Sequence, residues 1–236
     1  SAQWALKNTG QNQGTAGIDI NYLPAREVTQ GSSDIIVAVL DHGTQLDHPD
    51  LNVSSKSYDT ETGRSPSQIW GNHGTACSGI ISAKTNNNLG VAGIAPNCPV
   101  MSISNQLMGT SDAPQKRADG FNWAWRNGAS VISNSWRSST FSELLEDAIQ
   151  SAMTNGRNGL GCVVTFSAGN YDSNTVGYPA RSLPDIIVVG ALSLSGKRKS
   201  STTIDNEGWW GSDYGTQLDI MAVSYTHLRA HETDSY

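Results

Sequence analysis

Five short apolar runs, separated by stretches with helical character, constrain the fold of this chain most strongly. All five are rich in Val and Ile, and they span Ile35–Leu40, Val100–Ile103, Ala129–Ile132, Cys162–Phe166 and Asp185–Ala191. Short runs of this kind are typical of parallel strands that are buried on both faces. Because strands alternate with helices, the sequence predicts an α/β fold of three layers with a mostly parallel central sheet.

Three helices are predicted between these strands. One follows Thr140, which forms a capping box with Glu143, and it ends at the turn residues Asn155-Gly156. Its apolar positions recur at helical period: Leu144, Leu145, Ala148, Ile149, Ala152 and Met153. A second helix begins near Asp112, with Pro114 in its first turn, and breaks at Asn127-Gly128. A third spans about His73 to Ala83.

The bulk composition excludes several classes of protein. The 236 residues are enough for one domain with a sizeable core. The formal net charge of -6 and the lack of a basic segment argue against a nucleic-acid partner. No apolar run reaches the ~18 residues that a membrane span needs, so we expect no membrane partner. We also expect the protein to be a monomer.

Polar residues of catalytic type follow two of the predicted strands and precede a helix. Asp41 ends the first apolar run and is followed by His42-Gly43. His73 stands before Gly74-Thr75 and a helix of small residues. Ser167-Ala168-Gly169-Asn170 follows a later strand. Each motif alone is common in turns and loops. Since active residues gather at the carboxyl ends of parallel strands, their order along the chain makes the set specific.

At this point the sequence resembles the subtilisin-like (subtilase) family over about residues 3 to 222. Asp41-His42-Gly43 stands where the family has Asp-Ser/Thr-Gly, and His73-Gly74-Thr75 matches its His-Gly-Thr. Ser167-Ala168-Gly169-Asn170 matches the oxyanion-hole segment, and Asn134-Ser135-Trp136 resembles the substrate-binding strand. Later landmarks are Gly177-Tyr178-Pro179-Ala180 and Leu218-Asp219-Ile220-Met221-Ala222.

The resemblance implies peptide-bond hydrolysis through a Ser acyl-enzyme. Asp41 is expected to orient His73, which takes the proton of a Ser hydroxyl, and Asn170 to donate to the oxyanion. An extended protein or peptide substrate is expected to add a strand by main-chain hydrogen bonds. The expected substrate-binding residues are Ser133, Ser135, Trp136, Ser167, Ala168 and Gly169. The resemblance also implies a secreted enzyme with a pro-segment.

The chain departs from this family at the nucleophile. The family's Ala-Pro-Gly landmark and its Gly-Thr-Ser-Met-Ala segment do not occur in the sequence. We therefore expect residues 1–222 to be a partial peptidase domain, and residues 223–236 to be an unrelated tail of cloning or frameshift origin. The chain itself is expected to have little or no turnover. The alternative is a peptide-binding pseudoenzyme or an inactive remnant.

Two replacements beside the expected site leave alternatives open. His42 takes the place of a small hydroxyl residue, and it either perturbs the hydrogen bonds of Asp41 or points to solvent. Arg137 follows Trp136 where the family usually has Gly. Its side chain either narrows the cleft and favours acidic substrate residues, or is simply exposed. A nucleotide-binding enzyme is disfavoured because neither the dinucleotide fingerprint nor a Gly-Lys-Ser/Thr loop is present.

A structural calcium ion is the cofactor that the resemblance implies. Residues 85–91 resemble the family's calcium loop, and hard oxygen ligands suit Ca²⁺. The expected ligands are the side chains of Asp50 and Asn87 and the backbone carbonyls of Thr85, Leu89 and Val91. The alternative is a polar turn in which Asp50 caps a local loop.

Three cysteines leave at least one thiol unpaired. Cys77 lies one helical turn after His73, and it resembles a buried structural thiol that some family members hold beneath the catalytic His. A disulfide between Cys98 and Cys162 is an open alternative to two further free thiols.

Overall fold

The computed structural model describes residues 3–203, 205 and 207–223. The chain divides into two compact units. The larger unit is formed by Gln30–Phe166 and Tyr178–Ile187, and the smaller one by Ser1–Thr29, Ser167–Gly177 and Val188–Tyr236. Each unit has its own internal contacts.

The larger unit is built around parallel strands. These are β1 (Ile36–Asp41), β2 (Tyr58–Asp59), β3 (Val100–Ser104), β4 (Ala129–Asn134) and β5 (Val163–Ser167). Their order is β2-β3-β1-β4-β5, and every pair is parallel. The buried Val and Ile runs therefore became strands, and the predicted α/β class with a mostly parallel sheet is confirmed.

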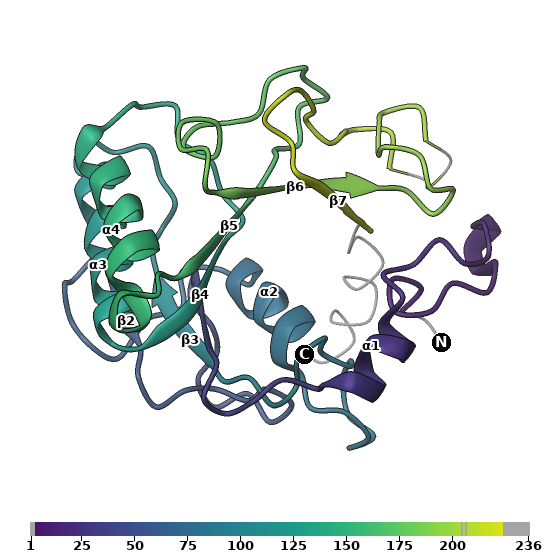
Figure 1. The fold of residues 1–236 in the computed structure, drawn as a ribbon, viewed down its shortest axis with the longest axis horizontal. Coiled ribbons are helices and arrows are strands. Elements are labelled where there is room, and N and C mark those ends of the chain that lie inside the picture. The colour runs from purple at the N-terminus through teal and green to yellow at the C-terminus, as the bar shows by residue number, and fades with distance from the viewer. Residues whose placement is uncertain (1–2, 204, 206, 224–236) are drawn as a thin grey trace. The chain divides into compact units, whose positions relative to one another are not determined.

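Helices cover both faces of these strands, as Figure 1 shows. Helix α2 (His73–Ser82) packs against β1 and β3, while α3 (Ala113–Arg126) and α4 (Glu143–Gly159) lie side by side on the opposite face. The layers bury large apolar side chains completely, among them Leu40, Ile103, Phe121, Ile132, Ile149 and Phe166. Burial of such side chains stabilises the fold by about 1.5–3 kcal/mol each, so this core fixes the strand ends that follow it.

The start of α4 differs from the predicted capping box. Thr140 is not the cap; Ser142 is, in an extended conformation, and its Oγ accepts the N–H of Leu145 at 3.3 Å. The N–H of Thr140 instead donates to Oγ of Ser138 at 3.1 Å. Glu143 thus becomes the first helical residue. Several hydroxyl residues precede the helix in residues 138–142, and the one nearest the apolar positions Leu144 and Leu145 is the cap.

The other predicted helix ends agree with the structure. Asp112 directly precedes α3, Pro114 lies in its first turn, and Asn127 follows its last residue. Gly128 then adopts a left-handed φ of 99°, which glycine reaches without steric cost. In α4 the helical dihedral angles stop at Gly156, as the turn residues predicted.

The smaller unit contains elements that the sequence patterns did not predict. They are η1 (Gln11–Gln13), α1 (Tyr22–Val28), and β7 (Ile220–Val223), which pairs in parallel with the predicted β6 (Ile187–Leu192). Val223, assigned by sequence to the tail, is the last residue of β7. The rest of that tail, 224–236, lies outside the described residues.

Two further expectations concern cysteines and membranes. Cys77, Cys98 and Cys162 are all free, so the alternative of a Cys98–Cys162 disulfide is wrong. The Cys162 thiol instead donates to the carbonyl of Ala129 at 3.0 Å. Among the described residues, no helix has the length and apolar character to cross a bilayer.

Candidate active site

Asp41 and His73 meet at the carboxyl end of the sheet in the larger unit. Asp41 is the last residue of β1 and is fully buried, while His73 is the first residue of α2 and its side chain is 26 % exposed. Nδ1 of His73 lies 2.8 Å from Oδ1 and 2.9 Å from Oδ2 of Asp41. The pair that the sequence predicted is therefore formed, and its other ring nitrogen, Nε2, is not used by the carboxylate.

Two glycines let the loop after β1 pass close to the start of α2. Gly43 has a left-handed φ of 94°, and a Cβ there would collide with the carbonyl of Gln68. A Cβ on Gly74 would in turn collide with the backbone of Gly43. The motifs Asp41-His42-Gly43 and His73-Gly74-Thr75 thus need their glycines for close backbone approach.

The backbone beside Asp41 also fixes the carboxylate. The N–H of His42 donates to Oδ1 of Asp41 at 2.7 Å. The ring of His42 is half-buried beside Gly71, and it lies edge-on to His73 with ring centroids 6.2 Å apart. Neither sequence alternative describes it fully, because the His42 main chain supports Asp41 while its side chain lies against the site.

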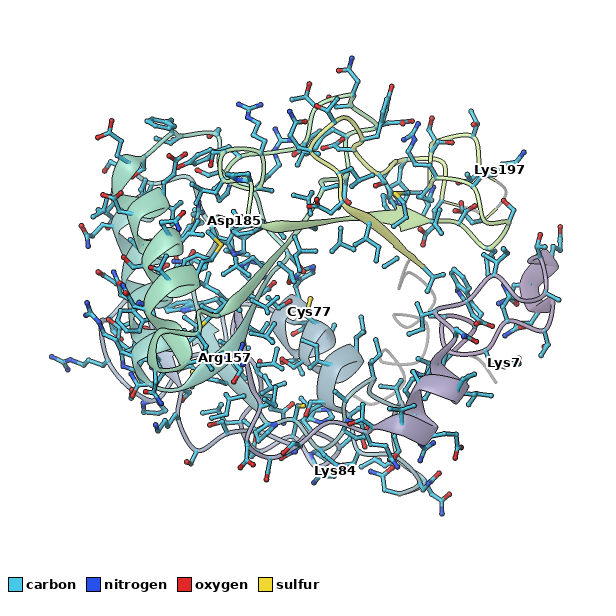
Figure 2. The ribbon with its side chains drawn as sticks, in the orientation of Figure 1. Lys7, Cys77, Lys84, Arg157, Asp185 and Lys197 are labelled. Carbon is cyan, nitrogen blue, oxygen red and sulfur yellow. The ribbon has the colours of Figure 1, made fainter. Side chains whose placement is uncertain are left out.

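Cys77 lies one turn along α2 from His73, and Figure 2 labels it there. Its Sγ is 3.8 Å from Nδ1 of His73 and 3.8 Å from Oγ of Ser135. The thiol is half-buried rather than buried. Asp41, His73 and Cys77 offer ligand atoms within 4.8 Å of one another, so this cluster is also the place in the described residues where a soft metal ion would find ligands.

The neighbours of His73 strongly favour its charged form. The hydrogen bond to Asp41 is the largest cause and the contact with Cys77 the next, and together they outweigh burial and raise the pKa of His73 to about 10. A carboxylate that stabilises the imidazolium in this way makes the ring a stronger proton acceptor. When the ring is neutral, Nε2 can therefore take a proton, and Asp41 stabilises the resulting charge.

The expected substrate strand lies at the end of β4 in the same unit. Ser133 is registered with Val39 of β1 and Thr165 of β5. Ser135 and Trp136 follow the last residue of β4, and Trp136 is buried edge-on against Phe166 with ring centroids 5.0 Å apart. Ser135 is connected to His73 through the thiol of Cys77.

The side chain of Arg137, the residue after Trp136, is exposed. This position agrees with the simpler of the two alternatives that the sequence left open.

The remaining predicted residues, Ser167 to Asn170, belong to the smaller unit. The N–H of Ala168 donates to the carbonyl of Val189 at 2.8 Å, and the carbonyl of Gly169 accepts the N–H of Asp213 at 2.9 Å. Gly169 has a left-handed φ of 117°. Asn170 itself is exposed. The loop is therefore fixed by hydrogen bonds immediately before the exposed amide side chain.

Asp213 is a supporting residue that sequence reasoning missed. It is fully buried, and its Oδ1 accepts the N–H groups of Tyr171 and Ser173 at 2.9 Å each. These bonds fix the chain on the other side of Asn170. No local motif marks Asp213, because its partners lie 40 and 42 residues away in the sequence.

The expected calcium loop brings four of its five residues into one set of hydrogen bonds. The buried carboxylate of Asp50 accepts Nδ2 of Asn87 at 2.6 Å and the N–H of Val91 at 3.2 Å. The amide oxygen of Asn87 accepts the N–H of Leu89 at 3.2 Å. Thr85 lies in the same loop. As described, the Asp50 carboxylate accepts N–H donors from the loop, which is the polar turn of the alternative. Asp50 and Asn87 both carry the oxygen ligands that suit Ca²⁺, and Asn87 would have to turn its amide oxygen from the N–H of Leu89 toward the ion.

Known proteins resemble this chain in sequence. Subtilisin NAT of Bacillus subtilis subsp. natto is 33% identical over 196 residues, which are 80% of this chain and 46% of the relative. A calcium-dependent protease of Trichormus variabilis is 31% identical over 235 residues, 88% of this chain and 34% of the relative. The chain spans about half the length of the curated relatives it matches first.

Solved structures support the fold. A protease from Pseudoalteromonas arctica PAMC 21717 superposes with a TM-score of 0.73 and 26% identity, over 94% of this chain and 70% of that one. MycP1 with its N-terminal propeptide removed superposes with a TM-score of 0.66 at 21% identity, over 86% of this chain and 68% of that one. The likeness to MycP1 concerns the fold alone.

A family model also matches most of the chain and not only the short motifs. The model of the Subtilase family matches residues 32–234, which include Asp41, His73 and Asn170. It begins just before β1 and runs past β7. With the paired Asp and His at the carboxyl end of a parallel sheet, this match establishes that the chain belongs to the subtilase family.

Proposed function

We propose that the protein is a serine endopeptidase in which Asp41 and His73 are the orienting acid and the general base. The observation that carries the proposal is the contact of both Asp41 oxygens with Nδ1 of His73. In the proposed reaction, Nε2 takes the proton of a Ser hydroxyl while the Ser oxygen attacks the peptide carbonyl carbon. The same proton then passes to the leaving amine as the C–N bond breaks. Water repeats the sequence and releases the acyl group.

We assign substrate binding and stabilisation of the oxyanion to the residues that the sequence predicted for these roles. An extended peptide adds to the segment of Ser133, Ser135 and Trp136 by main-chain hydrogen bonds. Asn170 donates its amide to the oxyanion, and Ser167 to Gly169 form one wall of the pocket for the residue before the scissile bond. The anchored backbone around Gly169 and Asp213 supports this role, because an oxyanion donor must be held in place before reaction.

Hydrolysis by this mechanism needs a serine nucleophile. We call a protein that has the residues of this chain together with that serine the parent enzyme. The 236 residues contain no Gly-Thr-Ser-Met-Ala segment, and we propose that this chain binds peptides with little or no turnover. Hydrolysis then belongs to a protein that carries the serine. A peptide-binding pseudoenzyme, which would use the same substrate segment without cleavage, is the second candidate function.

Calcium is proposed as a structural ion of the loop that follows α2. Asp50 and Asn87 supply side-chain oxygens, and Thr85, Leu89 and Val91 supply carbonyls. The ion would neutralise the buried carboxylate of Asp50. The calcium-dependent proteases among the relatives support this assignment.

We further propose a secreted monomer that acts on proteins and is made with a pro-segment. The secreted state and the pro-segment follow from membership of the family. MycP1, whose structure was solved with its N-terminal propeptide removed, is a precedent for such a segment in a protein of this fold.

The experiment that tests the function re-reads the encoding gene after the codon for Ala222 and labels the expressed protein with a fluorophosphonate. An in-frame Gly-Thr-Ser-Met-Ala segment and labelling of its serine support the endopeptidase. A gene that encodes residues 223–236 in frame and without this segment, with a product that binds peptides but takes no label, supports the second candidate instead.

A further inference from the structure

Two buried donors lie together beside the proposed substrate segment. Arg117 of α3 is 2 % exposed and Trp136 is 7 % exposed, and the guanidinium carbon lies 4.8 Å from the centroid of the Trp136 ring. Nε of Arg117 and Nε1 of Trp136 are both buried with no hydrogen-bond acceptor among the described residues. Buried polar groups in proteins are nearly always paired, so this site calls for an acceptor.

The charge of Arg117 is also incompletely compensated within the described part of the chain. Its Nη2 donates to the carbonyl of Met108 at 3.1 Å, and no described carboxylate lies within ion-pair distance of it. The nearby Glu61 binds Lys116 at 2.7 Å and accepts the N–H of Gln106. Burial lowers the pKa of Arg117, and Glu61 opposes this only by longer-range attraction. A buried cation in this state gains most from a carboxylate.

The site is close to the surface and to the segment that receives substrate. Met108 is 59 % exposed, and residues 109–112, which lead into α3, are exposed as well. Trp136 directly follows Ser135, whose hydroxyl contacts Cys77 beside His73. Since alternate side chains of an extended peptide point to the same side, a peptide along this segment would present some of its side chains to the side on which Trp136 lies.

We propose that Arg117 is a specificity-determining residue, and that together with Trp136 it binds the carboxylate of an Asp or Glu side chain in an extended peptide lying along Ser133 to Trp136. The inference rests on the proposed function, because it needs a peptide in this segment. Arg is suited to the role, since its planar fork binds a carboxylate through two parallel hydrogen bonds. The other account of Arg117 is structural: it holds the Met108 loop and packs on Trp136.

Peptide binding to the 236-residue chain tests the proposal without any need for turnover. The probes are fluorescein-labelled octa-alanine peptides in which one Glu is placed at each position in turn, and a matched set with Gln, measured by fluorescence anisotropy. At one position Glu should bind about tenfold more tightly than Gln, which corresponds to about 1.4 kcal/mol. Because a buried pair is screened little by salt, the preference should persist in NaCl at about 0.5 M.

Variants separate Arg117 from its exposed neighbour. Arg117→Met should abolish the preference for Glu and leave the affinity for Gln peptides within about twofold, while Arg137→Met should keep the preference. Arg117→Lys should weaken it, and this variant decides the question if Arg117→Met does not fold. Equal binding of Glu and Gln peptides overturns the proposal and leaves the proposed function intact. Absence of any peptide binding overturns both, and loss of the preference in Arg137→Met overturns the assignment to Arg117.

Discussion

Both carboxylate oxygens of Asp41 lie within hydrogen-bond distance of one nitrogen of His73, Nδ1, at 2.8 and 2.9 Å. The buried carboxylate of Asp41 thus contacts the half-buried ring of His73 at Nδ1. This relationship fixes the tautomer of the neutral ring, with the proton on Nδ1, and it stabilises the imidazolium that forms when Nε2 accepts a second proton.

The first prediction concerns the titration of His73. Its pKa is raised to about 10, first by Asp41 and then by Cys77, so the neutral ring that can act as a base accumulates as the pH rises toward that value. Asp41→Asn should lower the pKa of His73 by more than about one unit, because the charged partner is lost. NMR titration of the His73 Cε1–H signal measures it. Asp34→Asn, at an exposed position, is the control, and an unchanged His73 titration in Asp41→Asn contradicts the assignment.

The second prediction concerns the close backbone approach beside Asp41 and His73. Gly43→Ala places a Cβ against the carbonyl of Gln68 at a left-handed φ. The strain and the clash should together lower the free energy of unfolding by about 2–4 kcal/mol. Gly63→Ala is the matched control, since Gly63 also has a left-handed φ of 67° but its nearest neighbour is 3.7 Å away. Urea denaturation measures both, and equal losses argue against the clash.

The third prediction concerns a buried lysine in the smaller unit. Lys199 is fully buried, and its Nζ donates to the carbonyls of Ser200, Glu207 and Trp210 at 2.9, 2.8 and 3.1 Å. Its Nζ also lies 3.4 Å from the carboxylate of Asp205. Removal of one partner of a buried ion pair typically costs about 3–5 kcal/mol, because the other charge is left uncompensated.

Lys199→Met should therefore lower the free energy of unfolding by about 3 kcal/mol. The exposed Lys197, labelled in Figure 2, gives the matched variant Lys197→Met, which should change stability by less than about 0.5 kcal/mol. Denaturant melts of both variants decide the point. If both variants lose the same free energy of unfolding, the buried ammonium group of Lys199 does not contribute to stability.

The fourth prediction concerns calcium. If the loop after α2 holds the ion, saturating Ca²⁺ at about 100 times its dissociation constant adds ~2.7 kcal/mol, which raises the melting temperature by roughly 5–10 °C. EDTA should reverse the shift, and Asp50→Asn should remove it. Asp47→Asn, at an exposed position, should respond to Ca²⁺ like the unchanged chain. A melting temperature that is the same in Ca²⁺ and in EDTA contradicts the site.

Much of the sheet was predictable because strands buried on both faces leave a strong local signal. Val37 to Leu40 and Val100 to Ile103 are almost wholly buried, and their apolar runs identified β1 and β3. By contrast, β2 has only Tyr58 and Asp59, and it exists because it pairs with β3. A strand of this length has no pattern of its own, so only tertiary contacts define it.

The residues of the candidate site were predictable from the sequence where they belong to short local motifs. They were not predictable where their contacts join residues far apart in the sequence. Asp41 and His73 stand in short motifs with glycines that the backbone needs. Asp213 and Arg117 do not. Arg117 lies on a helix that the sequence predicted, but nothing in the sequence showed that its guanidinium would be buried against the distant Trp136. Such residues are found only once the elements are packed.

The central claim is that His73, held by Asp41, is the base of a serine endopeptidase. The most direct test measures kcat/KM for casein hydrolysis by the gene-encoded protein that carries the serine, with and without His73→Ala. Loss of a general base should lower kcat/KM by about 10²–10⁴-fold while the variant stays folded. A His73→Ala protein that hydrolyses casein within about tenfold of the unchanged enzyme would contradict the account.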